Sequence, residues 1–296
     1  MRWLRSRIVL ILGILVLVYT FVPIFIVILM SFNKLPSEQS KIYKFNSFTF
    51  DNWLHPCADP SMCDALKRSI EIGLLATLGA TVLGTLAGFA LVRHDFVGRS
   101  STNILIFLPM AAPEIVMGSS LLALFVSSGL AGQLGFWTIL IAHIMFCLSF
   151  VVVTVRSRLA GLSDTLEQAA ADLYATPNQT FWKVTFPLVL PGIAAAAMLS
   201  FSLSFDDFII TNLNAGNTTT FPMYVWGVSR KTIPMQINVV GTVMLIISVA
   251  IVVGGELRNR ARMRALARPG RPEPVHADTV VASAAGRSTA GHLDAV

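Results

Sequence analysis

Long apolar stretches alternate with short polar segments along this chain of 296 residues. A helix needs about 20 predominantly apolar residues to cross a bilayer. Six stretches meet this requirement, at residues 8–30, 70–92, 104–126, 134–155, 188–210 and 237–255. The pattern therefore predicts an all-α polytopic membrane protein with six transmembrane helices.

The third and fifth of these spans are less regular than a simple anchor. The third contains Pro109, Pro113 and Glu114, and the fifth carries Asp206 and Asp207 toward its end. We expect Pro113 to free a backbone carbonyl and kink its helix. Ionisable groups at membrane depth cost roughly 2.5–3.5 kcal/mol on insertion scales, so they indicate function.

Two interpretations of these carboxylates remain open. Adjacent residues on a helix point about 100° apart, so one of Asp206 and Asp207 faces a substrate pathway while the other pairs or caps. In the alternative both are interfacial and solvated. Glu114 either lines the pathway or pairs with a basic residue at a subunit interface.

The polar segment 212–236 is rich in aromatic residues and has the composition of a short amphipathic helix. Its Tyr224 and Trp226 are candidates for stacking on a cation. Anchoring at the membrane interface is the more common role of such residues.

Composition agrees with a membrane protein. The chain is 54% hydrophobic and 13% charged, with a mean hydropathy of +0.70, whereas soluble domains carry about 25% charged residues. The net charge of +6 comes from basic residues beside apolar runs, which indicates membrane topology and not nucleic-acid binding. Six spans put both termini on the same side of the membrane, and most of the 22 Lys and Arg residues fall in segments on that side. Because basic residues are enriched in cytoplasmic segments, both termini are expected in the cytoplasm. The first stretch is too long for a secretory signal and is expected to be a retained helix.

The three cysteines have different predicted roles. Cys147 lies in the fourth span and is expected to pack as a small residue. Cys57 and Cys63 lie in a predicted outer loop, where a short-loop disulfide is possible in an oxidising compartment. Metal binding by these two with His55 is the weaker alternative.

The segment between the fourth and fifth spans, about residues 157–187, is the longest predicted inner loop. Asp164 and Glu167 have the spacing of a capping box, which predicts a helix from Thr165 to Ala175. Thr176 and Pro177 are a second helix-start signal. A short alanine-rich helix is marginal alone, so we expect it either to dock a cytoplasmic protein or to lie on the membrane surface.

Sequence motifs for bond-making chemistry are absent. The chain contains no Walker-type loop, HExxH or GxSxG, and its histidines at positions 55, 94, 143, 276 and 292 form no ligand spacing. We therefore expect no catalytic or metal site in this chain. It comprises a membrane domain (residues 1–258) and a disordered cytoplasmic tail (residues 259–296) that is rich in Arg, Ala and Pro.

Residues 168–187 resemble the EAA loop of the membrane subunits of ABC importers, of the binding-protein-dependent, MetI-like family. The family pattern Glu-Ala-Ala, three residues, Gly, nine residues, Ile-x-Leu-Pro becomes Gln168-Ala169-Ala170, then Tyr174, then VTFP at 184–187. The spacing is kept, but Gln replaces Glu and Tyr replaces Gly, while Glu167 supplies a carboxylate one position earlier. The stretches FTFDNW (48–53), 96–122, 186–216 and 221–242 look like the polyamine branch, the second permease subunit of spermidine/putrescine importers.

This resemblance implies an importer half in a bacterial inner membrane. Two permease subunits, expected to form a heterodimer, would bind an ATPase dimer inside, and an external solute-binding protein would deliver polyamine. ATP and Mg²⁺ would be bound by the partner ATPase, so this chain needs no cofactor. The loop would act as the coupling helix, and the residues implied in ATPase coupling are Glu167, Gln168, Ala169, Ala170, Asp172, Leu173, Tyr174, Ala175 and Pro177.

Rival functions remain at this point. Within the same class, the chain is an importer permease for another small solute. From a different class, it is a channel or an ion-coupled secondary carrier, although a carrier more often shows paired repeats with broken helices in both halves.

Overall fold

We analysed a computed structural model of the chain, which describes residues 2–34, 44–163, 165–230 and 233–266; side chains are described except at 2–6, 259 and 262–266. The described residues fall into two compact units, divided between Val239 and Val240. All functional residues discussed below lie in the first unit.

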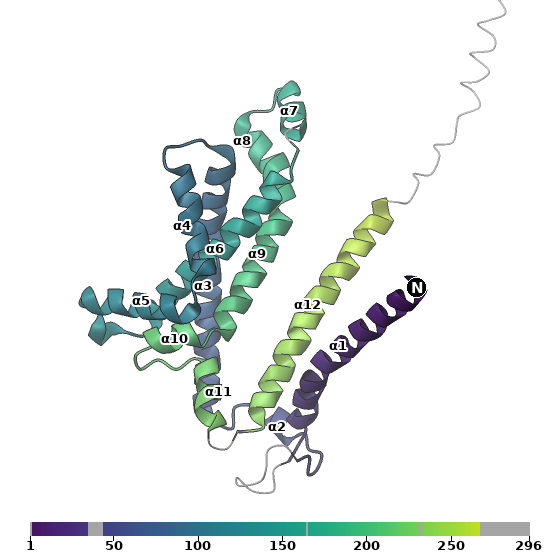
Figure 1. Ribbon diagram of the computed structural model, residues 1–296, viewed down its shortest axis with the longest axis vertical. Helices are drawn as coiled ribbons and strands as arrows, with labels where there is room; N and C mark the ends of the chain where they lie inside the picture. Colours follow the sequence, from purple (N-terminus) through teal and green to yellow (C-terminus); the bar gives the residue numbers. More distant parts are fainter. Residues whose placement is uncertain (1, 35–43, 164, 231–232, 267–296) are drawn as a thin grey trace, which may run out of the picture. The chain divides into compact units, whose positions relative to one another are not determined.

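The described residues form helices and one isolated antiparallel bridge between Asn33 and Phe48. The helices, labelled in Figure 1, are α1 (Arg2–Ser31), α2 (Asp51–Leu54), α3 (Pro60–Arg93), α4 (Arg99–Ala111), α5 (Glu114–Ser127), η1 (Ala131–Gln133), α6 (Phe136–Ala160), α7 (Thr165–Asp172), α8 (Pro177–Thr180), the π-helical turn η2 (Phe181–Thr185), α9 (Phe186–Asp206), α10 (Ile209–Asn214), α11 (Phe221–Ser229) and α12 (Gln236–Leu266).

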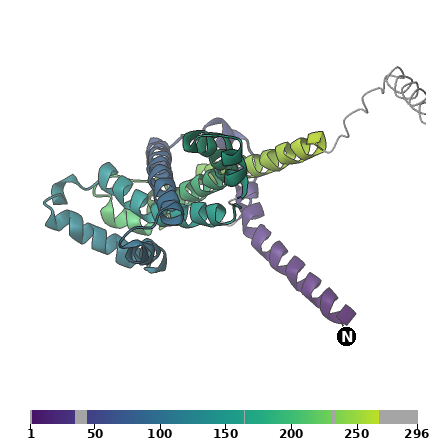
Figure 2. The same ribbon diagram turned by 90° about the horizontal axis from the view of Figure 1, so that it is seen from above.

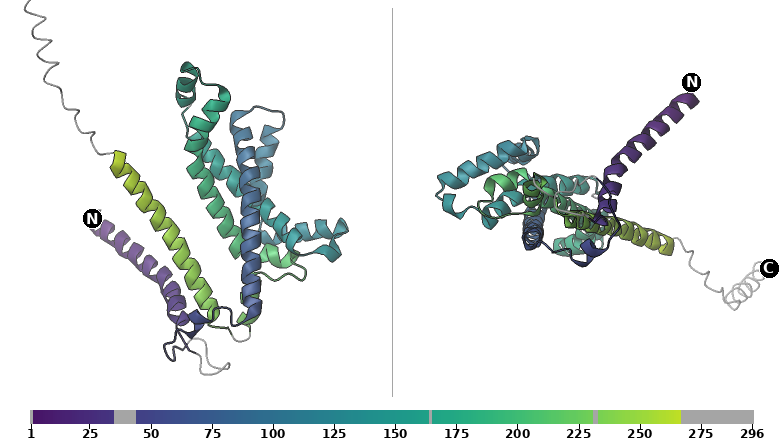
Figure 3. Two further views of the ribbon diagram at one scale, coloured as in Figure 1. Left: turned by 180° about the vertical axis from the view of Figure 1, so that it is seen from behind. Right: turned by 90° about the horizontal axis from the view of Figure 1, so that it is seen from below.

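Five helical stretches are long and apolar enough to cross a membrane, and a bent pair gives a sixth when it is counted as one span. This agrees with the predicted all-α polytopic fold. The expected continuous third span is wrong in its geometry, because α4 and α5 meet at an angle of 110° (Figures 1 and 3). Pro113, at φ −57° and ψ 135°, ends the helical path, and Glu114 begins a new helix. The expected kink at Pro113 is therefore a break.

The centre of the first unit is the packing of α3 against α6 and α9, which lie side by side (Figures 1 and 2). Small residues on α3 let the helix backbones approach closely, as is usual between membrane helices. A Cβ added at Gly84 would lie 2.7 Å from the side chain of Val151, and one at Gly88 would lie 3.2 Å from Val155. The close contact of α3 and α6 therefore depends on these glycines.

Helix α5 is joined to this core through α10. The amide of Asn214 donates to the backbone oxygen of Gly118 (3.2 Å), and a Cβ at Gly118 would lie 2.8 Å from Leu213. Buried apolar residues of α5, including Met117 and Leu121, belong to the same core cluster as Ile210. The break at Pro113 thus places the start of α5 near the end of α9.

The C-terminal end of α1 is fixed by the FTFDNW segment. The amide of Asn52 donates to the backbone oxygens of Ser31 (3.1 Å) and Asn33 (3.0 Å), and the indole of Trp53 donates to the Ser31 hydroxyl (3.2 Å). Phe32 stacks on the Trp53 ring at 5.4 Å. These contacts satisfy backbone groups that a helix end leaves unpaired.

The second unit contains most of α12. The helix continues to Leu266, past the predicted end of the sixth span at 255, and Arg260 pairs with Glu256 at 2.6 Å. The first residues of the predicted disordered tail are therefore helical. The rest of that tail, residues 267–296, lies outside the described residues.

Candidate functional site

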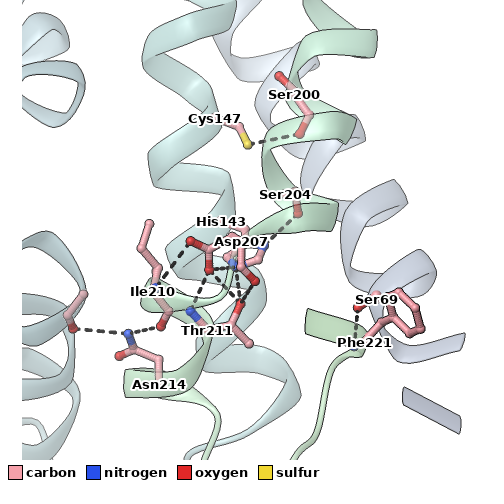
Figure 4. A network of polar contacts seen from close by, with 11 residues as sticks. Ser69, His143, Cys147, Ser200, Ser204, Asp207, Ile210, Thr211, Asn214 and Phe221 are labelled. Atoms are coloured by element: carbon pink, nitrogen blue, oxygen red, sulfur yellow. Dashed lines mark hydrogen bonds and ion pairs between the residues drawn. The ribbon is translucent and has the colours of Figure 1, made fainter. Parts of the chain in front are cut away.

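The polypeptide turns sharply at the end of α9. Asp206 is the last residue of the helix, Asp207 is extended (φ −63°, ψ 128°), and α10 begins at Ile209. The carboxylate of Asp207 turns toward α10 and accepts hydrogen bonds from the backbone N–H and the hydroxyl of Thr211, both at 2.8 Å (Figure 4). It also accepts a longer bond from the Ile210 N–H (3.4 Å). Asp207 thus satisfies the free N–H groups that begin α10.

His143 of α6 completes a buried polar network at this corner (Figure 4). One ring nitrogen lies 2.7 Å from the Ser204 hydroxyl, and the other lies 2.9 Å from the Thr211 hydroxyl and 3.4 Å from the Asp207 carboxylate. His143 is 1% exposed and Asp207 is 8% exposed. A buried carboxylate with these partners is a fixed structural charge, since separating it from them would be costly.

Sequence reasoning missed His143, because we searched the histidines for metal-ligand spacing. The available signal was its position inside the fourth predicted span, where an ionisable side chain needs a partner or a role. Its partners on α9 and α10 are more than 60 positions away in the sequence, so they could not be named in advance.

A cavity of about 860 Å³ opens beside this corner. Four of the five residues predicted for the substrate pathway line it: Glu114, Asp206, Asp207 and Trp226. Apolar and aromatic side chains supply most of the remaining lining, from Phe146, Leu203, Phe205, Phe208, Ile209, Phe221, Pro222 and Val225. The cavity therefore combines carboxylates with ring faces.

Glu114 and Asp206 differ from Asp207 in having no partner. Within the described part of the chain, neither carboxylate makes an ion pair or a hydrogen bond with another residue. Asp206 is exposed and Glu114 stands in the first turn of α5, where the helix dipole favours a negative charge. Of the two adjacent aspartates, Asp207 is thus the one that pairs and caps, and Asp206 borders the open space.

The two predicted aromatic residues, Trp226 and Tyr224, lie in different surroundings. Trp226 is half exposed, its ring lies 5.3 Å from that of Phe208, and the guanidinium of Arg230 stands 5.4 Å from its centre. Tyr224 does not line the cavity. It is buried, and its hydroxyl donates to the Asp59 carboxylate before α3 (2.5 Å).

The predicted coupling loop contains α7 and α8. The first helix ends at Asp172, three residues earlier than expected, because Tyr174 has φ +60°. The Tyr174 N–H donates to the oxygen of Ala171 (2.9 Å) and the Ala175 N–H to that of Ala170 (3.0 Å), which is the Schellman helix end. Tyrosine therefore adopts the left-handed turn that glycine would occupy in the family pattern.

The same turn exposes the tip of the loop. Leu173 is 81% exposed and Tyr174 is 96% exposed, and Gln168, Ala169 and Asp172 are also exposed, while Ala170 and Ala175 are partly buried. The second predicted start is present, since Thr176 and Gln179 form a capping box ahead of Pro177.

Glu167 has a role that we did not predict. Its carboxylate accepts from the Arg93 guanidinium (2.6 Å) and from the Thr185 hydroxyl (2.7 Å), so it joins α7 to the end of α3 and to η2. Both contacts lie outside its own helix. Asp164, the predicted cap, lies outside the described residues.

Cys57 and Cys63 are joined by a disulfide, with their Cα atoms 5.6 Å apart, and Cys147 is a buried free thiol. A disulfide sulfur has no thiolate to offer a metal. In the described ranges no three His, Cys, Asp or Glu side chains are grouped so that they could hold a metal ion.

Comparison with known proteins places these features in a family. The model of the family described as "Binding-protein-dependent transport system inner membrane component" matches residues 80–258. The spermidine/putrescine transport system permease protein PotC of Escherichia coli K12 is 34% identical over 247 residues, covering 83% of this chain and 91% of that protein. The putrescine transport system permease protein PotI of the same organism is 37% identical over 193 residues, covering 63% of this chain and 69% of that protein.

Solved structures agree on the fold. A bacterial ABC transporter involved in the import of the acidic polysaccharide alginate has a chain with a TM-score of 0.59 and 19% identity, covering 87% of this chain and 96% of its own. The methionine ABC transporter MetNI in an inward-facing conformation gives a TM-score of 0.55 and 16% identity, covering 69% of this chain and 98% of its own. The chain is therefore an all-α, multi-pass membrane protein that belongs to the family of inner membrane components of binding-protein-dependent transport systems.

Proposed function

We propose that this chain is a permease subunit of an ATP-driven importer that takes up polyamines such as putrescine and spermidine. The cavity with the two unpartnered carboxylates of Glu114 and Asp206 carries the proposal. The relatives named as spermidine/putrescine and putrescine permeases support the same solute class.

The chemistry of the cavity suits a flexible polycation. Ammonium groups pair with carboxylates strongly where water is partly excluded, and ring faces such as that of Trp226 attract cations and cover methylene groups. Because Asp207 is already occupied by His143 and Thr211, Asp206 and Glu114 are the charges left for a substrate. A neutral solute would displace water from both carboxylates without offering them a counter-charge, at a cost in free energy, and an anionic solute would be repelled by them.

We place both termini in the cytoplasm, since most basic residues then lie inside. The α7–α8 loop also lies on this side and is the coupling site for a partner ATPase dimer, which binds ATP and Mg²⁺. Its exposed Leu173 and Tyr174 supply an apolar contact surface. The second permease subunit completes the pathway, a solute-binding protein delivers polyamine from outside, and lipid covers the exposed apolar surface of α1.

In this proposal the ion pair of Glu167 transmits movement. A displacement of α7 by the ATPase reaches α3 through Arg93 and the start of α9 through Thr185. Helices α3 and α9 then move against each other as the cavity alternates between the two sides, a two-state rearrangement.

The proposal is tested by radiolabelled putrescine uptake in cells that lack their own polyamine importers. Asp206→Asn and Glu114→Gln should each reduce uptake by about tenfold or more at equal protein level, since each removes one charge contact. Asp51→Asn is the matched control, because Asp51 is an exposed carboxylate that pairs with His55. Uptake at the wild-type rate in both cavity variants would contradict the proposed pathway.

A further inference from the structure

The turn closed by the disulfide is linked to Tyr224 of α11 through the carboxylate of Asp59. Cys57 and Cys63 close a short turn, which we name the cystine turn (residues 57–63). Asp59 lies inside this turn and makes two bonds with its carboxylate. One oxygen accepts from the Ser61 N–H (2.9 Å) at the start of α3, and the other accepts from the Tyr224 hydroxyl of α11 (2.5 Å).

Helix α11 is attached to α3 at a second point. The N–H of Phe221, the first residue of α11, donates to the hydroxyl of Ser69 (2.8 Å), which is buried on α3. This N–H has no partner within its own helix. With the Asp59 bond, α11 is held by two polar contacts, one with the residue that caps the start of α3 and one with Ser69 on α3 itself.

The face of α11 that points away from Tyr224 carries Pro222, Trp226 and Ser229, which form a wall of the cavity. Phe221 and Val225, on the flanks of the helix, also line it. At about 100° per residue, Tyr224 points about 160° away from both Pro222 and Trp226. A bond at Tyr224 therefore fixes the rotation of the helix and, with it, the direction in which Trp226 faces.

The protonation states make this bond stable at physiological pH. The hydrogen bond from Tyr224, with further bonds from Ser61, lowers the pKa of the Asp59 carboxyl below its ordinary value. Burial, together with the bond to Asp59, raises the pKa of Tyr224 to about 12. At neutral pH the tyrosine thus remains a donor and the aspartate an ionised acceptor, which gives a charge-assisted bond.

We infer that the cystine turn positions the cavity helix α11 through Asp59 and Tyr224, and that transport requires this turn to be closed by its disulfide. The disulfide limits the conformations of the turn, so Asp59 is held where it meets both the start of α3 and Tyr224. Asp59 and Tyr224 are positioning residues and do not themselves touch the substrate. The inference rests on the proposed function for its effect on uptake, whereas the effect on α11 is independent of it.

Three variants test the connection at separate points: Tyr224→Phe, Asp59→Ser and the double variant Cys57→Ser/Cys63→Ser. Serine keeps the helix cap at position 59 but is too short to reach Tyr224 as well. The control is Glu71→Gln, which breaks an exposed ion pair with Arg68 on α3 without touching α11. Each protein is studied as the full chain, assembled with its transport partners.

The first measurement is hydrogen–deuterium exchange of the α11 backbone amides, and the second is the maximal rate of polyamine uptake. We expect amide exchange in residues 221–229 to be about tenfold faster in all three variants, and uptake about fivefold slower, because one charge-assisted bond is lost. Tyr224→Phe/Asp59→Ser should match either single variant, since both changes remove the same bond.

Wild-type exchange in α11 for Tyr224→Phe and for the cysteine variant would overturn the inference, as would wild-type uptake in both. If the wild-type complex carries no polyamine, the proposed function fails. The exchange data alone then decide whether the cystine turn holds α11. If the cysteine variant misfolds, the exchange rates of Tyr224→Phe and Asp59→Ser decide between the two outcomes.

Discussion

A carboxylate with several polar partners lies near each end of α9, Glu167 near its start and Asp207 just after its last residue. The two carboxylates differ in burial and in partners. At the Thr185 end, Glu167 is shared by an arginine and a hydroxyl, and both charged side chains are about 30% exposed. At the Asp207 end, the carboxylate is held by His143 and the start of α10 and is 8% exposed. The open, partly solvated pair suits a contact that must change during transport, whereas the buried network suits a corner that must stay fixed.

The comparison also separates Asp206 from its neighbour Asp207. One residue apart in sequence, Asp207 has all its bonds within the protein, and Asp206 borders the cavity without a partner among the described residues. Fixing one carboxylate gives the corner its shape, and leaving the other free gives the cavity its charge. Substitutions should therefore affect folding at Asp207 and transport at Asp206.

Replacing Asp207 with leucine should have the largest effect. It leaves His143 and the N–H groups of α10 buried without their acceptor, and breaking a buried pair in this way costs about 3–5 kcal/mol. We expect little or no folded protein in the membrane, measured by expression level and by thermal melting in detergent. Asp206→Asn should fold normally, and equal melting temperatures for the two variants would contradict the division of roles.

Replacing Leu173 with aspartate tests the exposed tip of the coupling loop. The substitution removes an apolar side chain from the proposed ATPase-binding surface and places a charge there, which should weaken ATPase binding by about a hundredfold. Retention of the ATPase on purified membranes measures this effect. Val97→Asp is the matched control, because Val97 is an apolar side chain even more exposed than Leu173 and lies in the α3–α4 loop. Full retention in Leu173→Asp would remove the loop from the interface.

Changing Glu167 to glutamine tests the ion pair between Glu167 and Arg93. Glutamine keeps a hydrogen-bonding group but loses the charge-assisted bond to Arg93, which is worth about 1.5–3 kcal/mol. We expect the ATPase to stay bound and active while the solute transported per ATP falls about tenfold. The control is Asp95→Asn, an exposed carboxylate of the α3–α4 loop that pairs with Arg99. A normal ratio in Glu167→Gln would show that the pair does not transmit movement.

Tyr174→Gly has the smallest expected effect. The left-handed conformation costs a residue with a Cβ atom roughly 1 kcal/mol, so glycine should strengthen the helix end after α7. Amide exchange at Ala175 should therefore slow by about twofold to fivefold. The variant also lacks the exposed ring, so any contact that the ring makes with a partner is weakened. Faster exchange in the glycine variant would mean that the tyrosine side chain stabilises the turn.

Much of the fold followed from periodicity and length. Five helical stretches and the bent pair correspond to the six predicted apolar spans. The break at Pro113 did not follow, because Pro109 remains inside α4 while Pro113 ends the helical path. Before Pro113 the backbone of Ala112 is extended (φ −75°, ψ 136°), whereas the chain before Pro109 stays helical. A proline in the sequence is compatible with either outcome.

The candidate site was partly predictable for similar reasons. Charge at membrane depth identified Glu114, Asp206 and Asp207, but the partner that distinguishes the two aspartates comes from α6, far away in the sequence. Tyr224 was predicted from its aromatic character alone, and its hydroxyl instead meets Asp59. The spacing of a capping box singled out Glu167, but its contacts with Arg93 and Thr185 come from distant parts of the chain and could not be read from that spacing.

The most direct test of the account is transport by the purified complex in proteoliposomes, with its partner permease, ATPase and solute-binding protein. A series of solutes with two or three ammonium groups, one ammonium group or none separates the charge requirement from size. We predict ATP-dependent accumulation of putrescine or spermidine, little of a monoamine and none of a neutral sugar. Accumulation of a neutral or anionic solute in preference to polyamines, or polyamine movement without ATP, would contradict the account.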